Sequence, residues 1–281
     1  FFEIIEVITQ PDKKAGRKQL LAEPPIKTEA LKYNITVRQP ENISDYNLPQ
    51  TDLIMVIAYA QILPEKILNI PKYGAVNLHG SLLPKYRGAA CVQAAILNGD
   101  SESGISFIKM DAGIDTGPIL INKKMEIKPT GTGGSLYAKL SELGGKFIVP
   151  TLSDYIKRKI APYSQDQTQA SYAKKLKKQD GQINWNLPAE KIERFIRAMS
   201  PWPGSYSLIN TKILKILEAK NKLLKTNKYK IGEIFLYNGF PAIQCGKDAL
   251  IIEILQLEGK KEISGKDFIK GYFKFIGSIL K

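Results

Sequence analysis

The stretch Gly74-Ala75-Val76-Asn77-Leu78-His79-Gly80 decides the fold class of the first half of the chain, and it holds the only histidine in 281 residues. Its alternating pattern predicts a β-strand that ends at Gly80. Asn77 and His79 lie two residues apart, so their side chains project from the same face of that strand. In open α/β sheets the ligand crevice lies beyond the carboxyl ends of the strands. An amide and an imidazole are therefore expected to meet at such an edge.

The segments around this stretch alternate between strand and helix patterns. The continuous apolar run 52–58 predicts a strand that is buried on both faces of a parallel sheet, and residues 89–98 predict a helix that ends at Gly99. Residues 1–160 are therefore expected to form an α/β domain with a Rossmann-like, doubly wound, mostly parallel sheet.

The pattern changes in the second half of the chain. The polar residues 161–176 predict a linker between two domains. Residues 177–281 contain short strands separated by turn signals such as Asn238-Gly239, which favours a tight hairpin. We expect this half to form a small, OB-like β-barrel.

The net charge of the whole chain is +14. Residues 1–160 carry 20 basic and 16 acidic side chains, whereas residues 161–281 carry 21 and 11, a net charge of +10. This excess indicates an acidic partner such as nucleic acid, although a solvated lysine-rich surface has the same composition. No apolar run is long enough to span a membrane, so no membrane span is indicated.

The site at the strand end calls for one more polar group. An asparagine amide can stabilise a developing oxyanion, and an imidazole can move a proton near neutral pH. Asp111 and Asp115 follow a later predicted strand on a glycine-rich loop, and either can supply the carboxylate; a plain turn is the alternative reading of that loop. The two cysteines, Cys91 and Cys245, lie far apart and fit reduced thiols. With a single histidine, no metal site is expected.

Two long motifs, N-L-H-G-S-L-L-P-K-Y-R-G-A-A at 77–90 and M-D-A-G-I-D-T-G at 110–117, resemble those of the 10-formyltetrahydrofolate-dependent formyltransferases. Further segments support the resemblance over nearly the whole chain: T-Q-P-D-K-K-A-G-R at 9–17, V-I-A-Y-A-Q-I-L-P at 56–64 and S-P-W-P-G at 200–204. The resemblance implies that Asn77, His79 and Asp115 are catalytic and that 10-formyltetrahydrofolate is the co-substrate.

The resemblance also implies a binding stretch for the folate. The family's folate-binding segment matches Ser81, Leu82, Leu83 and Pro84. Ile57 and Ala58 are expected to add apolar walls for the pterin and its linker, and the Leu83–Pro84 bond can be cis because only X–Pro bonds adopt that form at low cost.

The resemblance implies that the formyl acceptor is the α-amine of initiator methionyl-tRNA. This places the chain in translation initiation, in the cytoplasm of a bacterium or in an organelle matrix. The resemblance assigns Lys13, Lys14, Arg17 and Lys18 to a basic loop that contacts the acceptor stem of the tRNA. Pro11, Ala15 and Gly16 are expected to keep this loop irregular. Whether His79 or a water molecule takes the proton of the amine stays open.

This chain departs from the family pattern in two places. Cys91 stands where the family usually has proline. The chain also opens on what matches the family's second strand, so the first βα unit is missing from the sequence, either because the sequence is trimmed or because the protein lacks the unit. The alternatives are a formyltransferase acting on the amine of a nucleotide sugar, a hydrolase that releases formate, and a catalytically dead RNA-binding relative. The family suggests a monomer.

Overall fold

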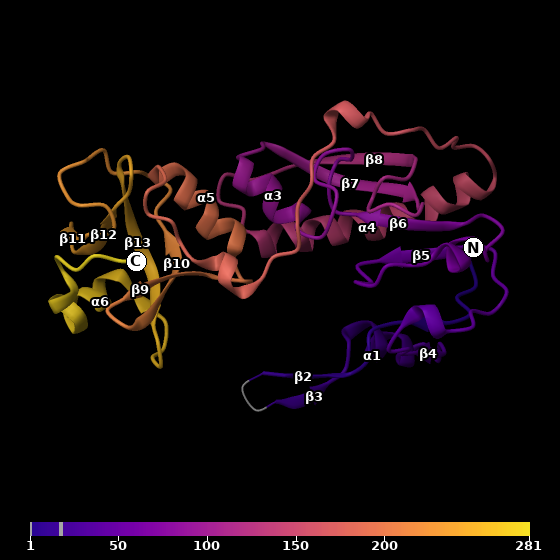
Figure 1. The fold of residues 1–281 in the computed structure, drawn as a ribbon, viewed down its shortest axis with the longest axis horizontal. Coiled ribbons are helices and arrows are strands. Elements are labelled where there is room, and N and C mark those ends of the chain that lie inside the picture. The colour runs from indigo at the N-terminus through magenta and orange to yellow at the C-terminus, as the bar shows by residue number, and fades with distance from the viewer. Residues whose placement is uncertain (1, 17–18) are drawn as a thin grey trace. The chain divides into compact units, whose positions relative to one another are not determined.

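The computed structural model describes residues 2–16 and 19–281, and the chain forms two compact units (Figure 1). Unit 1 contains Phe1–His79, Ile105–Lys123 and Glu142–Ala170; unit 2 contains Gly80–Gly104, Lys124–Ser141 and Ser171–Lys281. The chain thus passes between the units several times. The domain boundaries expected at residues 160 and 177 stay a prediction.

The helices alternate with strands in the first half of the chain, as the sequence pattern predicts. The helices are α1 (Pro25–Lys32), α2 (Glu65–Leu68), α3 (Cys91–Asn98), α4 (Gly133–Ile156), α5 (Ala189–Met199) and α6 (Gly265–Tyr272). The strands are β1 (Val7–Ile8), β2 (Lys13–Ala15), β3 (Leu20–Ala22), β4 (Val37–Arg38), β5 (Ile54–Ile57), β6 (Ala75–His79), β7 (Glu102–Lys109), β8 (Ile119–Glu126), β9 (Ser205–Ile209), β10 (Lys212–Ala219), β11 (Ile234–Tyr237), β12 (Phe240–Gln244), β13 (Ala249–Leu257) and β14 (Ile263–Ser264).

The central sheet of unit 1 has the strand order β5-β6-β7-β8. β5 and β6 are parallel, whereas β6 and β7 are antiparallel. The sheet is therefore mixed, and the prediction of a mostly parallel sheet holds only for its first pair and for the separate parallel pair β1–β4. The loop 110–118 is too short for a parallel connection between β7 and β8, because such a crossover needs about a dozen residues or more. The antiparallel pair β6–β7 is joined by the longer segment 80–101, which contains α3.

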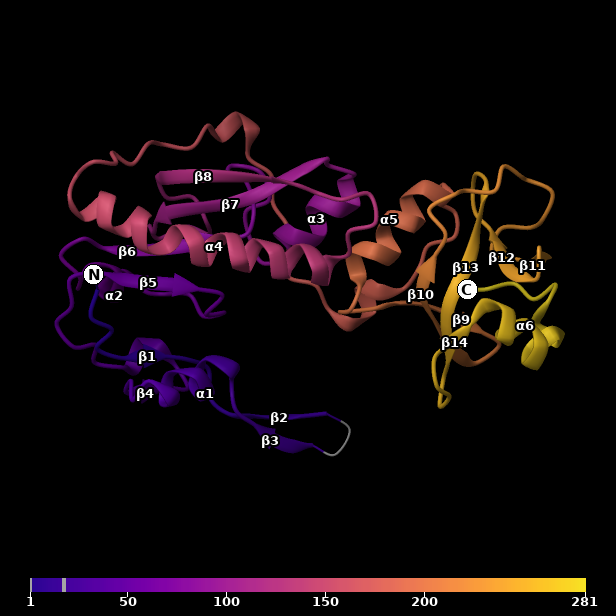
Figure 2. The ribbon, with the colours of Figure 1, turned by 180° about the vertical axis from the view of Figure 1, so that it is seen from behind.

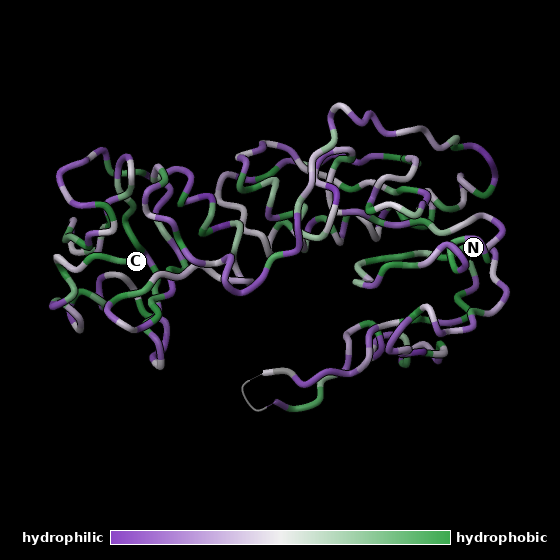
Figure 3. Tube along the Cα trace, viewed as in Figure 1, coloured by the Kyte–Doolittle hydropathy of each residue, from purple (hydrophilic) through white to green (hydrophobic). Residues whose placement is uncertain are grey.

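The prediction that residues 52–58 are buried on both faces is wrong. β5 is hydrophobic, as Figure 3 shows, yet its residues are only half-buried and the Ile57 side chain is 54% exposed. In the described part of the chain, β5 is the edge strand of its sheet, so neighbours cover it from one side only. Ile57 consequently presents apolar surface at the carboxyl end of this strand.

Helix α4 runs beside the strands of this sheet (Figure 2), and a pair of glycines governs how closely it packs. A Cβ atom added at Gly144 would lie 2.5 Å from Cδ2 of Leu78 on β6, whereas one added at Gly145 would meet no atom within 4 Å. Gly144 therefore permits a close approach of helix to strand, and Gly145 faces open space.

Unit 2 packs helix α5 against a sheet with the order β11-β12-β13-β10-β9, to which β14 adds beside β13. Its core includes Ile192, Ile196, Leu214, Ile252 and Leu255. The predicted hairpin turn at Asn238-Gly239 is confirmed, with φ angles of 48° and 80° between β11 and β12. Within the described residues no strand pairing joins β9 to β11, so the closed barrel is not confirmed.

Candidate functional site

The site begins at the carboxyl end of β6. Strand pairing places Ile57 of β5 opposite Leu78 and Val56 opposite Asn77, and because the two strands are parallel, both end at the same edge of the sheet. Asn77 and His79 flank Leu78 on the opposite face, as the period of a strand requires. The His79 side chain is buried, at 6% exposure, and Asn77 is half-buried.

The loop between β7 and β8 brings the third group. Asp111 accepts hydrogen bonds at Oδ1 from the backbone N–H of Gly113 (3.1 Å) and from Oγ1 of Thr116 (2.7 Å), so this carboxylate shapes the loop. Asp115 lies further along the loop with a left-handed φ of 54°, a conformation that is uncommon for residues other than glycine. Of the two aspartates that the sequence offered, one organises the turn and the other extends to the strand.

Asp115 contacts both polar side chains of β6. Nδ2 of Asn77 donates a hydrogen bond to Oδ1 of Asp115 at 3.2 Å, and Nδ1 of His79 lies 3.5 Å from Oδ2. The carboxylate therefore fixes the orientation of the amide and of the ring. Because an amide has two N–H groups and imidazole has two nitrogens, each side chain keeps a second polar atom that does not face Asp115. The three residues predicted from the sequence thus converge.

Gln165 is a residue of this site that the sequence did not reveal. Its side chain is buried, and its Nε2 donates to the backbone carbonyls of Asp115 and of Gly117, each at 2.8 Å. The residue lies in the polar stretch that predicts a linker, where no periodic pattern distinguishes a buried amide from an exposed one. Only the three-dimensional structure identifies it as a partner of the Asp115 loop.

The residues predicted for folate binding fall in both units. In unit 1, Ile57 and Ala58 are exposed at the end of β5. In unit 2, the hydroxyl of Ser81 donates to the carbonyl of Lys85 at 2.6 Å, which closes the loop 81–85. Leu82 and Pro84 are half-buried, whereas Leu83 is only 3% exposed. The expected cis form of the Leu83–Pro84 bond is confirmed.

The described part of the basic segment predicted to contact tRNA includes a short strand. Lys13 and Lys14 are exposed on β2, which pairs antiparallel with β3. For residues 13–15 the expectation of an irregular loop is wrong, because these residues form a strand; Gly16 follows with a φ of 71°, which glycine adopts readily. Arg17 and Lys18 lie outside the described residues.

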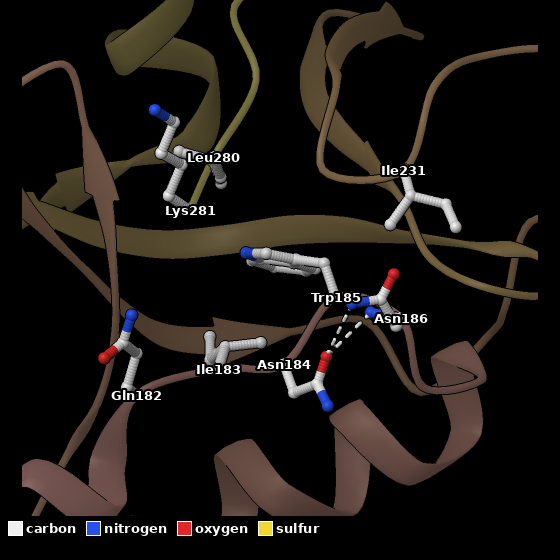
Figure 4. A pocket seen from close by; sticks show the side chains of 8 residues that line it. All are labelled: Gln182, Ile183, Asn184, Trp185, Asn186, Ile231, Leu280 and Lys281. Atoms are coloured by element: carbon white, nitrogen blue, oxygen red, sulfur yellow. Dashed lines mark hydrogen bonds between the residues drawn. The ribbon is translucent and has the colours of Figure 1, made fainter.

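A cavity of about 540 Å³ lies in unit 2 (Figure 4). Exposed amide side chains alternate there with the buried residues Ile183 and Trp185. The Nε1 of Trp185 donates to Oγ of Ser207 at 2.9 Å, so the polar atom of this core side chain has its partner. The lining residues are Gln182, Ile183, Asn184, Trp185, Asn186, Ile231, Leu280 and Lys281. None of the residues predicted for catalysis or folate binding is among them.

Two further features of the described chain concern metals and membranes. No group of three or more histidine, cysteine, aspartate or glutamate residues is placed there to hold a metal ion. Among the same residues, no helix combines the length and the apolar character needed to cross a bilayer.

Comparison with known proteins identifies similar chains along nearly the full length. Residues 2–152 match the formyl transferase family, and residues 175–273 match the C-terminal domain of formyl transferases. The chain is 40% identical over 279 residues to the methionyl-tRNA formyltransferase of Nitrosomonas eutropha, with 96% of this chain and 88% of the relative covered. It is 41% identical over 288 residues to that of Caldicellulosiruptor saccharolyticus, with 99% and 92% covered.

Solved structures share the fold at lower identity. An N-formyltransferase from Helicobacter canadensis, solved with folinic acid and dTDP-3-aminofucose, has a TM-score of 0.64 at 22% sequence identity, over 87% of this chain and 86% of that one. At this level of identity the likeness concerns the fold alone.

Proposed function

The chain belongs to the methionyl-tRNA formyltransferase family, and we propose that Asn77, His79 and Asp115 are the residues with which it transfers a formyl group from 10-formyltetrahydrofolate to the α-amine of methionyl-tRNA. The observation that carries this assignment is the convergence of an amide, an imidazole and a carboxylate at the carboxyl end of β6. Open α/β sheets bind their ligands at this edge.

The surroundings of the trio fit a folate. The benzoyl ring of a folate has apolar faces, as do parts of its pterin, and Ile57, which is 54% exposed, offers apolar surface at the same sheet edge. Ala58 follows it with a left-handed φ of 47°, which turns the chain away from the strand. Ser81, Leu82, Leu83 and Pro84 follow His79 directly in the chain after Gly80 and complete the proposed folate-binding set.

The polar groups match the charges that develop during formyl transfer. When bound, 10-formyltetrahydrofolate supplies an electrophilic formyl carbon, and in the overall exchange the amine loses one proton while the folate nitrogen gains one. The second N–H of Asn77 donates to the oxygen on which negative charge builds, a contribution of about 3–4 kcal/mol at comparable sites. Asp115 contacts His79 at Nδ1 and so orients the ring, and either His79 or a water molecule takes the proton of the amine.

The tRNA side of the proposal rests on charge. Lys13 and Lys14 on β2, together with Arg17 and Lys18, are proposed to contact the acceptor stem. The net charge of +10 over residues 161–281 is proposed to hold phosphates further along the tRNA. An OB-like barrel in the C-terminal half, a doubly wound sheet in the N-terminal half, a monomeric state and a location in a cytosol or organelle matrix remain predictions.

The nucleotide-sugar and RNA-binding alternatives have less support. Relatives near 40% identity carry the methionyl-tRNA name, whereas the solved sugar-type transferase shares only 22% of its residues. The test is formylation by the purified protein with 10-formyltetrahydrofolate and two separate acceptors, methionyl-tRNA and a dTDP-linked amino sugar. Formylmethionyl-tRNA is the expected product. Formylation of the sugar alone would overturn the proposal, and so would no transfer to either acceptor.

A further inference from the structure

The stretch between the two family matches, 2–152 and 175–273, includes residues that bond the loops on which the proposed site is built. We infer that residues 163–173, here named the strap, act as a positioning element for formyl transfer rather than as a passive linker. This inference rests on the proposed function. One end of the strap holds the loop that carries Asp115, and the other end holds the loop that carries the proposed folate-binding residues.

The first end of the strap belongs to unit 1. Tyr163 pairs with Ile119 at the start of β8, through hydrogen bonds of 2.8 and 2.9 Å between their backbones. Gln165 then reaches the loop before β8 and donates to the carbonyls of Asp115 and Gly117. The buried amide of Gln165 thus hydrogen-bonds the backbone at Asp115 and two residues beyond it. These bonds stabilise the left-handed backbone of Asp115, which is unfavourable by itself.

The other end of the strap belongs to unit 2 and pairs with the loop after Pro84. The backbone N–H of Arg87 donates to the carbonyl of Ser171 at 2.8 Å, and that of Ala173 donates to the carbonyl of Arg87 at 2.7 Å. The hydroxyl of Ser171 accepts from the backbone N–H of Tyr86 at 2.9 Å. The strap therefore adds a short parallel bridge to the loop that begins with the proposed folate-binding residues.

This loop is held in conformations that need such support. Tyr86 has a φ of 60°, which is uncommon for a residue other than glycine, whereas Gly88 adopts its φ of 101° without steric cost. A Cβ atom at Gly88 would lie 2.7 Å from the carbonyl oxygen of Ala173, so loop and strap are in close contact. Unfavourable backbone angles persist where surrounding contacts over-determine them, and such angles cluster at functional sites.

A buried arginine adds side-chain contacts between the strap and the loop 81–88. Arg87 is only 1% exposed, its Nη1 donates to the hydroxyl of Tyr172 at 3.2 Å, and its guanidinium lies 5.7 Å from the centre of that ring. A buried charge is costly unless it is hydrogen-bonded. Tyr172 is one of the partners that make this burial possible, so the strap and the loop are coupled by side chains as well as by backbone.

The two ends of the strap predict two different kinetic effects. Misplacing Asp115 disturbs the groups that act on the transition state, so it lowers kcat. Loosening the loop 81–88 disturbs the ground-state contacts of the folate, so it raises the KM for 10-formyltetrahydrofolate. A residue that only stabilises the fold would change the amount of active protein and leave both constants per active site unchanged.

The test at the first end is Gln165→Met, which keeps the length of the side chain and removes its N–H donors. We expect kcat to fall by between about 10-fold and 100-fold with both KM values within about 2-fold, as for a small misplacement of a reacting group. The control is Gln169→Met, because the amide of Gln169 bonds Asp166 inside the strap; it should keep wild-type constants. The kcat is calculated per site that binds 5-formyltetrahydrofolate. A loss of folded protein therefore does not lower the measured kcat.

The test at the second end is Ser171→Ala. We expect the KM for 10-formyltetrahydrofolate and the Kd for 5-formyltetrahydrofolate to rise about 5-fold, the loss of one hydrogen bond, with kcat and the KM for methionyl-tRNA unchanged. Ser171→Thr keeps the hydroxyl and should restore the wild-type Kd.

Three results would overturn the inference: wild-type constants for both variants, equal effects in Gln169→Met, or no rescue by Ser171→Thr. The direct measurement of folate binding separates this failure from failure of the proposed function. If the wild-type protein binds 5-formyltetrahydrofolate yet formylates no methionyl-tRNA, the proposed function fails, and the Kd of Ser171→Ala still tests the strap.

Discussion

Asp115 contacts both of the other polar side chains at the end of β6, using one carboxylate oxygen for each. Asp115 lies on the loop between β7 and β8, whereas Asn77 and His79 lie on β6. The position of the shared carboxylate therefore depends on the loop and not on the strand. Each member of such a unit depends on the others, so the effects of single substitutions are not additive.

At the residue scale, Asn77→Ala and His79→Ala are each expected to lower kcat by more than about 100-fold, the usual loss when one oxyanion donor or proton carrier is removed. Both variants should remain folded, because neither side chain belongs to a hydrophobic core cluster of the described residues, although His79 is buried. The measurement is single-turnover formylation of methionyl-tRNA, with thermal melts alongside. Asn186→Ala is the matched control, since its amide donates to Oδ1 of Asn184 in the cavity of unit 2, which none of the predicted site residues line. Near-normal turnover in either site variant would contradict the assignment.

A second residue-scale prediction concerns alkaline stability. Burial raises the pKa of the Cys245 thiol from its ordinary value of 9.0 to about 12, and the nearby Asp248 carboxylate adds to the rise. Above pH 9 the thiol ionises in the unfolded chain but stays protonated in the folded protein, so this stabilisation is complete below pH 9 and is lost as pH rises toward 12.

Between pH 9 and about pH 12, the free energy of unfolding of wild type should therefore fall relative to that of Cys245→Ala by about 1.4 kcal/mol for each pH unit. Urea unfolding of both proteins over the alkaline range measures it. Ile243→Val, a substitution without a titratable group in the same core, should keep a constant difference from wild type. A pH-independent gap for Cys245→Ala would refute the prediction.

At the element scale, the two adjacent glycines of α4 should respond in opposite directions. Gly144→Ala forces a methyl group onto Leu78 and should reduce the free energy of unfolding by about 1–3 kcal/mol. Gly145→Ala meets no neighbour and should increase it by about 0.5–1 kcal/mol, because alanine loses less backbone entropy in a helix. Each variant serves as the control for the other in urea titrations. Destabilisation by both would mean that the helix tolerates no side chain at this turn.

The elements themselves were largely predictable from the sequence, whereas their environment was not. The patterns at 74–79 and 89–98 correctly indicated β6 and α3, and Asn238-Gly239 correctly indicated a hairpin, because local periodicity and turn chemistry act over short distances. The exposure of Ile57 could not be predicted, since it depends on which strand forms the edge of the sheet. The hairpin β2–β3 was missed because its strands are short and lack an alternating pattern.

The site shows the same division. The amide, imidazole and carboxylate follow from strand periodicity and from two long motifs. The residue pattern alone left Asp111 and Asp115 as equal candidates, and the resemblance to the family selected Asp115. The hydrogen bonds of the loop add that Asp111 bonds within the turn. Gln165 lay beyond reach, because its two acceptors are backbone carbonyls about 50 residues away in the chain.

At the scale of the whole molecule, the charge of the C-terminal half should govern tRNA affinity more than turnover. Replacing the exposed Lys222, Lys228 and Lys230 by glutamine is expected to weaken binding and to reduce the slope of log affinity against log salt by about 0.7–0.9 for each phosphate that is no longer neutralised. At saturating methionyl-tRNA, kcat should change by less than about 2-fold.

The control for this experiment is a triple variant with the same change in net charge, in which the exposed Lys66, Lys146 and Lys157 become glutamine. Binding is measured by filter retention over a range of salt concentrations. An equal change of slope in both triple variants would show that only the total charge matters, which would contradict a phosphate-binding surface in the C-terminal half.

The strap also has a consequence for recombination between relatives. The two family matches leave residues 153–174 unassigned, so this stretch looks like a natural crossover point for chimaeras. A junction inside 163–173 would separate Gln165, Ser171 or Tyr172 from the loops that they bond. A junction at 174–176 would transfer the C-terminal half as a module and leave those bonds within one parent. The best crossover point for chimaeras therefore lies at the end of the polar stretch 161–176 and not in its middle.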